Sequence, residues 1–159
     1  MDADAAPIRL ASAADAGAIA VLSRDTIEAG LPWRWQEPEI ARFIRSDRHN
    51  VIVSDAAGIL AGFAVMGYGA DTAYLALLAV APMARRGGLA RRLLRWLLKT
   101  GEVAGMASIT VDLREDNLAA QRLYETAGFV QFARKTGAYY GRVNQVSMRL
   151  AMRPAQTTS

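Results

Sequence analysis

The sequence contains no cysteine among its 159 residues and a single histidine, His49. Without thiols, the chain cannot form disulfides, thiolate zinc sites or iron–sulfur clusters, and it has no cysteine nucleophile. One histidine is too few for a His-rich metal site, so we expect no metal centre. The absence of cysteine is typical of a reducing compartment, and we expect a cytoplasmic protein.

Long hydrophobic runs are also missing, because no stretch reaches the roughly 18 consecutive apolar residues that a membrane span needs. The first residues include Asp2 and Asp4 and no basic residue ahead of an apolar run, unlike a signal peptide. Hydrophobic residues make up 52% and charged residues 21%, which is typical of a globular chain. We therefore expect one domain over residues 1–159, with its core at about 8–151 and a frayed tail at 153–159.

Positive charge is concentrated in one segment. The chain has 19 basic and 15 acidic residues, a net charge of +4. Five arginines lie between positions 85 and 95 with no acidic residue among them, and without them the chain is close to neutral. This distribution favours a local anionic partner over a nucleic acid.

Hydrophobic periodicity and turn residues predict an α+β fold. Strands are expected at 8–10, 51–54, 59–68, 72–80, 108–114, 129–134 and 145–151, and helices at 12–27, from Pro38, at 88–104 and at 118–127. A loop is expected at 135–144. The order β-α-α-β-β-β-α-β-α-β-β combines antiparallel hairpins with one parallel crossover. It predicts a central mixed, mostly antiparallel sheet flanked by helices.

The most specific local signal follows the strand at 72–80. Two adjacent glycines, Gly87 and Gly88, stand immediately before a long helix. The first-turn N–H groups and the dipole of a helix attract anions, and glycine lets the backbone approach phosphate oxygens closely. The flanking arginines add charge, so a pyrophosphate fits this segment. The segment lacks the Gly-Lys-Ser/Thr ending of a P-loop and the G-x-G-x-x-G dinucleotide pattern.

Three blocks of sequence resemble one family. Arg85-x-x-Gly88-x-Ala90 is similar to the Q/R-x-x-G-x-G/A pyrophosphate loop of the GNAT N-acetyltransferases, which bind acetyl-CoA. The segment from Asn117 to Phe129 resembles the family's second signature, and Val111–Arg114 resembles a strand of the ribosomal-protein alanine N-acetyltransferases. The resemblance extends over residues 8–151.

The resemblance also implies a set of site residues. The backbone of β-strand residues Leu78, Ala79 and Val80 would pair with the pantetheine arm. Residues of the loop and the first helical turn would surround the pyrophosphate: Arg85, Arg86, Gly87, Gly88, Leu89, Ala90 and Arg91. Asn117 would contact the cofactor, Tyr124 would protonate the departing thiolate, and Asp112 would act as the base, directly or through water.

Each of these side chains also has an ordinary structural interpretation. Tyr124 shares a helix face with apolar residues and fits a core, Asn117 fits a helix N-cap, and Asp112 fits the wet face of a strand. Four aromatic residues fit either an acceptor-pocket wall or a hydrophobic cluster beneath a loop: Trp33, Trp35, Tyr139 and Tyr140.

These expectations combine into an acetyl-CoA-dependent N-acetyltransferase. The acetyl group would pass from the thioester to a primary amine by direct attack in a ternary complex, and the acceptor would be a small amine, an amino acid or a peptide N-terminus. The alternatives are a non-catalytic acyl-CoA-binding sensor and a nucleotide-phosphate-binding module. No nucleic-acid or membrane partner is expected, and the aromatic residues are compatible with a homodimer.

Overall fold

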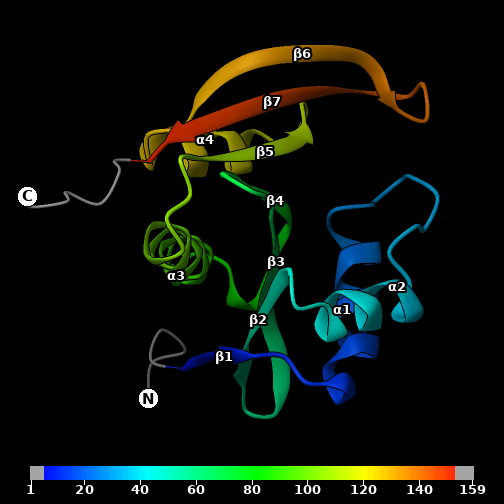
Figure 1. Ribbon diagram of the computed structural model, residues 1–159. Helices are drawn as coiled ribbons and strands as arrows, with labels where there is room; N and C mark the ends of the chain where they lie inside the picture. Colours follow the sequence, from blue (N-terminus) through cyan, green and yellow to red (C-terminus); the bar gives the residue numbers. More distant parts are fainter. Residues whose placement is uncertain (1–5, 153–159) are drawn as a thin grey trace, which may run out of the picture. The chain divides into compact units, whose positions relative to one another are not determined.

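The computed structural model describes residues 6–152, and the tail expected at 153–159 lies outside this range. The elements follow the predicted order (Figure 1). The strands are β1 (Ile8–Leu10), β2 (His49–Ala56), β3 (Ile59–Tyr68), β4 (Thr72–Val80), β5 (Ser108–Arg114), β6 (Val130–Tyr139) and β7 (Val143–Ala151). The helices are α1 (Ala16–Asp25), α2 (Glu37–Arg45), α3 (Leu89–Val103) and α4 (Leu118–Thr126).

The strands form one seven-stranded sheet in the order β1-β2-β3-β4-β5-β7-β6. Strands β4 and β5 are parallel, as expected for a strand–helix–strand crossover through α3. The β1–β2, β2–β3, β5–β7 and β6–β7 pairs are antiparallel. The mixed, mostly antiparallel sheet predicted from the sequence is therefore confirmed.

The chain divides into two compact units, which are described in turn. The first contains the chain up to Gly67 together with Ala76–Trp96, and the second contains Tyr68–Leu75 and the chain from Leu97 onward. Strand β4 and helix α3 each contribute residues to both units.

In the first unit, α1 and α2 lie on one side of the β2–β3 hairpin and the start of α3 lies on the other (Figure 1). Ile19, Ile40 and Phe63 are fully buried in the core that α1 and α2 cover. Helix α1 follows the predicted capping box, in which the Ser12 N–H donates to the Asp15 carboxylate at 2.7 Å.

The position of α3 against the sheet depends on Gly62 of β3. A Cβ atom at this position would lie 3.0 Å from Leu89 Cδ2 and 3.1 Å from the Ala79 carbonyl oxygen. Real Cβ atoms rarely come so close to a fixed backbone atom, so glycine permits this close approach. The approach holds the first turn of α3 near the end of β4.

In the second unit, β5 alternates as predicted: Ile109, Val111 and Leu113 are buried, while Asp112 and Arg114 are half-buried. Helix α4 lies beside the β5–β7 pair (Figure 1). The predicted loop at 135–144 is wrong, because β6 and β7 continue through most of it and leave a turn at 140–142.

Polar contacts hold this hairpin. The Gly137 N–H donates to Asn144 Oδ1 at 2.9 Å, and the Arg134 guanidinium pairs with Glu115 at the end of β5. Most of β6 is exposed. The sequence predicted only its first part, at 129–134, because residues 135–139 lack the apolar alternation from which a strand is predicted.

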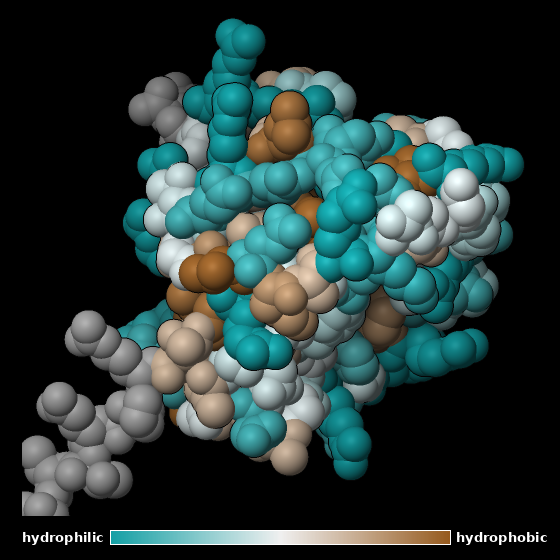
Figure 2. Space-filling view, turned by 90° about the horizontal axis from the view of Figure 1, so that it is seen from above, coloured by the Kyte–Doolittle hydropathy of each residue, from teal (hydrophilic) through white to brown (hydrophobic). Residues whose placement is uncertain are grey.

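Exposed apolar side chains are scattered. The face shown in Figure 2 is mostly hydrophilic with small, separate hydrophobic patches. The exposed large apolar residues of the second unit include Leu118, Val130 and Phe132. Within residues 6–152, no helix has the length and apolar character needed to cross a membrane.

Candidate functional site

The loop before α3 presents an open stretch of backbone. After a short 3₁₀ turn at Pro82–Ala84, Arg86 and Gly88 adopt positive φ angles of 72° and 80°. This conformation costs about 1–2 kcal/mol for a residue with a side chain and little for glycine. Apart from Gly88 itself and its two chain neighbours, no described atom lies within 4 Å of the position that a Gly88 Cβ would occupy. The backbone that leads into the first turn of α3 is therefore accessible to a ligand.

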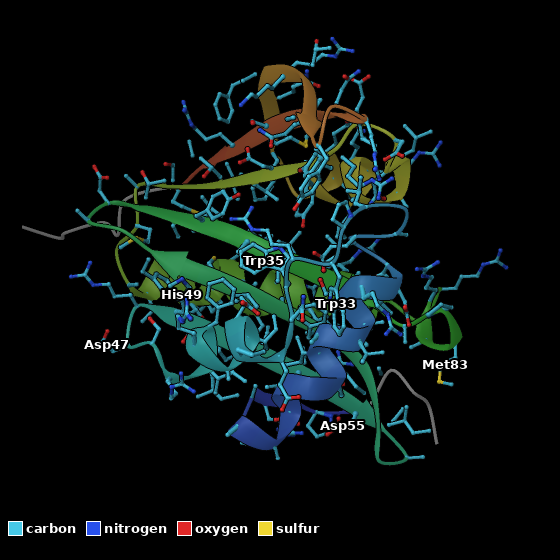
Figure 3. All side chains as sticks on the ribbon, turned by 90° about the vertical axis from the view of Figure 1, so that its right-hand side faces the viewer. Trp33, Trp35, Asp47, His49, Asp55 and Met83 are labelled. Carbon is cyan, nitrogen blue, oxygen red and sulfur yellow. The ribbon has the colours of Figure 1, made fainter. Side chains whose placement is uncertain are left out.

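Guanidinium groups surround this open backbone. Arg85, Arg86 and Arg91 are exposed, and Arg85 Nε also donates to the Val80 carbonyl oxygen at 3.4 Å. The preceding strand residues Ala79 and Val80 are buried, and Leu78 is half-buried. Exposed cations beside a helix N-terminus suit a pyrophosphate, and the empty space at Gly88 leaves room for one. Met83 in the same loop projects outward with 74% of its surface exposed (Figure 3).

In the second unit, Asp112 forms the centre of a polar cluster. Ser147 Oγ donates to Asp112 Oδ1 at 2.5 Å, and Tyr74 Oη donates to Asp112 Oδ2 at 3.1 Å. Asp112 and Ser147 are register partners on β5 and β7, and Tyr74 lies on the parallel strand β4. Asp112 is therefore held at both oxygens.

Tyr139 of β6 belongs to the same neighbourhood. Burial, followed by the negative charge of Asp112, raises the pKa of Tyr139 to about 12, while Arg114 opposes the shift. The Arg114 guanidinium itself binds Asp116 at 3.0 and 2.9 Å. We call Tyr74, Asp112, Tyr139 and Ser147 the Asp112 cluster.

The sequence analysis did not identify Tyr74 and Ser147. Tyr74 carries a weak signal in the sequence, because it is an aromatic residue with a hydroxyl in the otherwise mostly aliphatic β4. In the structure 41% of its surface is exposed. Ser147 carries none, because its proximity to Asp112 depends on strand register.

Helix α4 contains the other two predicted residues. Asn117 caps the helix through its Oδ1, which accepts the Ala120 N–H at 3.1 Å, so the N-cap interpretation is confirmed. Tyr124 is 4% exposed, and its ring packs edge-on against the Phe129 ring with the centroids 5.3 Å apart. Burial raises the pKa of Tyr124, which keeps its hydroxyl protonated at neutral pH.

Two predicted acceptor residues, Trp33 and Trp35, lie in the first unit, in the segment between α1 and α2 (Figure 3). Both pack against the core cluster, and the Trp35 ring lies 5.3 Å from the Phe43 ring. The Arg34 guanidinium covers Trp35 at 4.6 Å. The hydrophobic-cluster interpretation thus applies to both rings, and their contact with an acceptor stays a prediction.

Each unit thus carries part of the predicted site. The first unit contains the glycine loop, its arginines and both tryptophans. The second contains the Asp112 cluster, Asn117, Tyr124 and the exposed Tyr140, which adopts a positive φ of 55° in the β6–β7 turn.

Comparison with known proteins identifies relatives of this chain. A profile of the acetyltransferase (GNAT) family matches residues 20–129. The [ribosomal protein bS18]-alanine N-acetyltransferase of Escherichia coli K12 is 40% identical over 72 residues, which are 45% of this chain and 49% of that protein. In that alignment the chain spans about half the length of its relative.

Solved structures match over a longer range. The ribosomal-protein-S18-alanine N-acetyltransferase of Escherichia coli is 28% identical, with a TM-score of 0.82 and coverage of 96% of this chain and 97% of that one. An acetyltransferase from Salmonella typhimurium, solved with its cofactor acetyl-CoA, is 21% identical with a TM-score of 0.79 and covers 97% and 98%. It supports the fold alone. The family profile covers well over half of the residues, and the chain belongs to the GNAT acetyltransferase family.

Proposed function

We propose that this chain is an acetyl-CoA-dependent N-acetyltransferase whose acceptor is the N-terminal amine of a peptide. Membership of the GNAT family supports the reaction class. Two comparisons with proteins named as alanine N-acetyltransferases of a ribosomal protein support a peptide acceptor over a small amine. Transfer would occur directly within a ternary complex.

The open backbone at Gly88 is the observation that carries this proposal. The positive φ and the empty space at the missing Cβ fit a pyrophosphate held by the first-turn N–H groups of α3. Arg85, Arg86 and Arg91 would neutralise its charge. When bound, acetyl-CoA supplies the acetyl group as a reactive thioester.

The Asp112 cluster supplies a base for the amine. A protonated amine cannot attack a thioester, so a base must first accept its proton, and a carboxylate can do so. The hydroxyls of Ser147 and Tyr74 hold Asp112, and each carboxylate oxygen retains a further acceptor site for the amine or for a bridging water. In the same reaction the protonated hydroxyl of Tyr124 would donate to the departing sulfur.

A pair of glycine variants tests cofactor binding. Gly88→Glu places bulk and negative charge at the proposed phosphate site and should abolish acetyl-CoA binding in calorimetry. Gly58→Glu is the matched control, because Gly58 has a φ of 79° and equally empty surroundings but lies in the β2–β3 turn. The two variants carry similar backbone strain, so only the first should lose binding. Equal affinities in folded samples would contradict the assignment of this loop.

Acetyl transfer to a panel of acceptors tests the reaction. Mass spectrometry should detect acetylation of peptides with a free N-terminal alanine, and their N-terminally blocked counterparts should not react. Transfer to small amines alone would exclude the peptide acceptor. Binding of acetyl-CoA without transfer to any amine would identify a non-catalytic acyl-CoA sensor.

A further inference from the structure

Glu28 is a buried acidic residue to which the proposed reaction assigns no role. Its exposure is 6%, and it follows α1 in the turn that leads to the two tryptophans. Carboxylates are seldom buried unless they are well hydrogen-bonded, because transfer from water to the protein interior is costly. We therefore consider which hydrogen bonds stabilise the buried Glu28 carboxylate.

The Glu28 carboxylate joins the end of α1 to the segment that contains Trp33 and Trp35. Ser23 Oγ, on the last turns of α1, donates to Glu28 Oε2 at 2.9 Å. The backbone N–H groups of Arg34 and Trp35 both donate to Glu28 Oε1, at 2.6 and 3.1 Å. Two consecutive N–H groups directed at one oxygen form a small anion-binding concavity, filled here by a side chain of the same chain.

These hydrogen bonds determine where the two tryptophans lie. Exposure alternates along residues 31–36, with Trp33 and Trp35 turned inward and Arg34 outward. The carboxylate holds the two peptide groups that flank the Arg34 Cα, and Trp35 packs on Phe43 of α2. Loss of the carboxylate would leave the hydroxyl and both N–H groups without this acceptor.

We propose that Glu28 is a positioning residue for acceptor binding, which it supports by holding the Trp33–Trp35 segment in place. This inference rests on the proposed function, because it takes the segment to be part of the acceptor site. Glu28 acts through its hydrogen bonds and does not touch the acceptor or the cofactor.

Two substitutions at Glu28 separate hydrogen bonding from charge. Glu28→Gln keeps one oxygen for the Arg34 and Trp35 N–H groups, and its amide can donate to the Ser23 hydroxyl, which can accept. Glu28→Ala removes every acceptor. Asp55→Ala is the control. Asp55 is bound by Arg9, which also binds Asp15 just before the start of α1, whereas Glu28 follows the other end of that helix.

Steady-state kinetics with an N-terminal alanine peptide provides the first readout. Glu28→Ala should raise the acceptor KM by about tenfold while kcat and the acetyl-CoA KM change by less than about threefold. Glu28→Gln and Asp55→Ala should keep an acceptor KM close to that of the wild type. An unchanged acceptor KM in folded Glu28→Ala, or an equal rise in Glu28→Gln, would overturn the proposal.

Tryptophan fluorescence provides a readout that needs no turnover. In a Trp96→Phe background, emission comes only from Trp33 and Trp35. Glu28→Ala should shift this emission to the red and increase its quenching by acrylamide, and Glu28→Gln should not. Identical spectra would refute the positioning role.

The two proposals can fail separately. If the wild type acetylates no peptide, the proposed function fails, and fluorescence still tests Glu28. If Glu28→Ala does not fold, Ser23→Ala takes its place, because it removes one of the three hydrogen bonds at a fully buried site. It should raise the acceptor KM less than Glu28→Ala would, and an unchanged KM together with an unchanged spectrum would overturn the proposal.

Discussion

Asp112 differs from an ordinary strand carboxylate because Ser147 and Tyr74 hold both of its oxygens. Asp112→Asn keeps the size of the side chain and removes its basicity. We expect kcat/KM to fall by about 10²-fold at neutral pH and to recover partly at high pH, where free amine is abundant.

Ser147→Ala is the comparison for Asp112→Asn, since it leaves the carboxylate in place and should reduce kcat/KM less. A loss of the same size at every pH would indicate that Asp112 positions the amine. No loss would leave Asp112 without a role in proton transfer.

Tyr124 combines a core position with a proposed chemical role. Tyr124→Phe keeps the ring packed on Phe129 and removes only the hydroxyl. We expect kcat to fall by about 10²-fold with little change in acetyl-CoA affinity. Because burial raises the pKa of Tyr124, the hydroxyl stays protonated and the loss should be constant from mildly acidic to mildly alkaline pH. Wild-type turnover by this variant would leave the residue a purely structural role.

The hydrogen bonds of Asp15 should make the stability of the fold depend on pH. Hydrogen bonds from Arg9, and a further one from the Ser12 N–H, lower the pKa of Asp15 from 3.8 to about 2. A lowered pKa stabilises the fold above the unfolded-state value, and this contribution disappears as pH falls through the folded-state value. Thermal melts should show Asp15→Asn less stable than wild type by up to about 1 kcal/mol near neutrality. The difference should shrink as pH falls towards 2 and vanish below it, and a difference that persists well below pH 2 would exclude the Arg9 ion pair as its source.

At the scale of elements, two glycines of the first unit should respond in opposite ways to the same substitution. Gly17 lies inside α1, and a Cβ there would meet only the flexible end of Glu37 at 3.4 Å. Gly62 lies on β3, where a Cβ would meet the fixed Ala79 carbonyl oxygen at 3.1 Å.

Gly17→Ala should therefore stabilise the protein by about 0.5–1 kcal/mol, because alanine loses less backbone entropy in a helix. Gly62→Ala should destabilise it by about 1–3 kcal/mol through overpacking between β3 and α3. Urea denaturation measures both changes. Equal effects of the two substitutions would contradict the close packing at Gly62.

At the scale of the whole molecule, ligand binding should appear as thermal stabilisation. A ligand at 100 times its Kd that binds only the folded state stabilises the protein by about 2.7 kcal/mol. We expect acetyl-CoA to raise Tm by several degrees, and NAD and ATP at the same concentration to raise it much less. A comparable rise with NAD or ATP would favour a nucleotide-phosphate-binding module.

The amino-acid sequence by itself determined the order of the elements and the backbone part of the candidate site. The alternation of β5, the capping box before α1 and the glycines before α3 are local patterns, and each depends on residues within a few positions of one another. Local backbone preferences and burial periodicity are visible at that range. The Asn117 cap was predictable for the same reason.

Only the tertiary structure decided which side chains meet. Asp112 reaches Ser147 because β5 and β7 pair in one register, and a shift by one residue would turn Ser147 to the opposite face. The β6–β7 hairpin and the Glu28 contacts likewise depend on hydrogen bonds to polar groups brought close by folding. Such contacts leave no periodic hydrophobic pattern in the sequence. A hydrogen bond between residues that are distant in the chain depends on where the folded backbone places them.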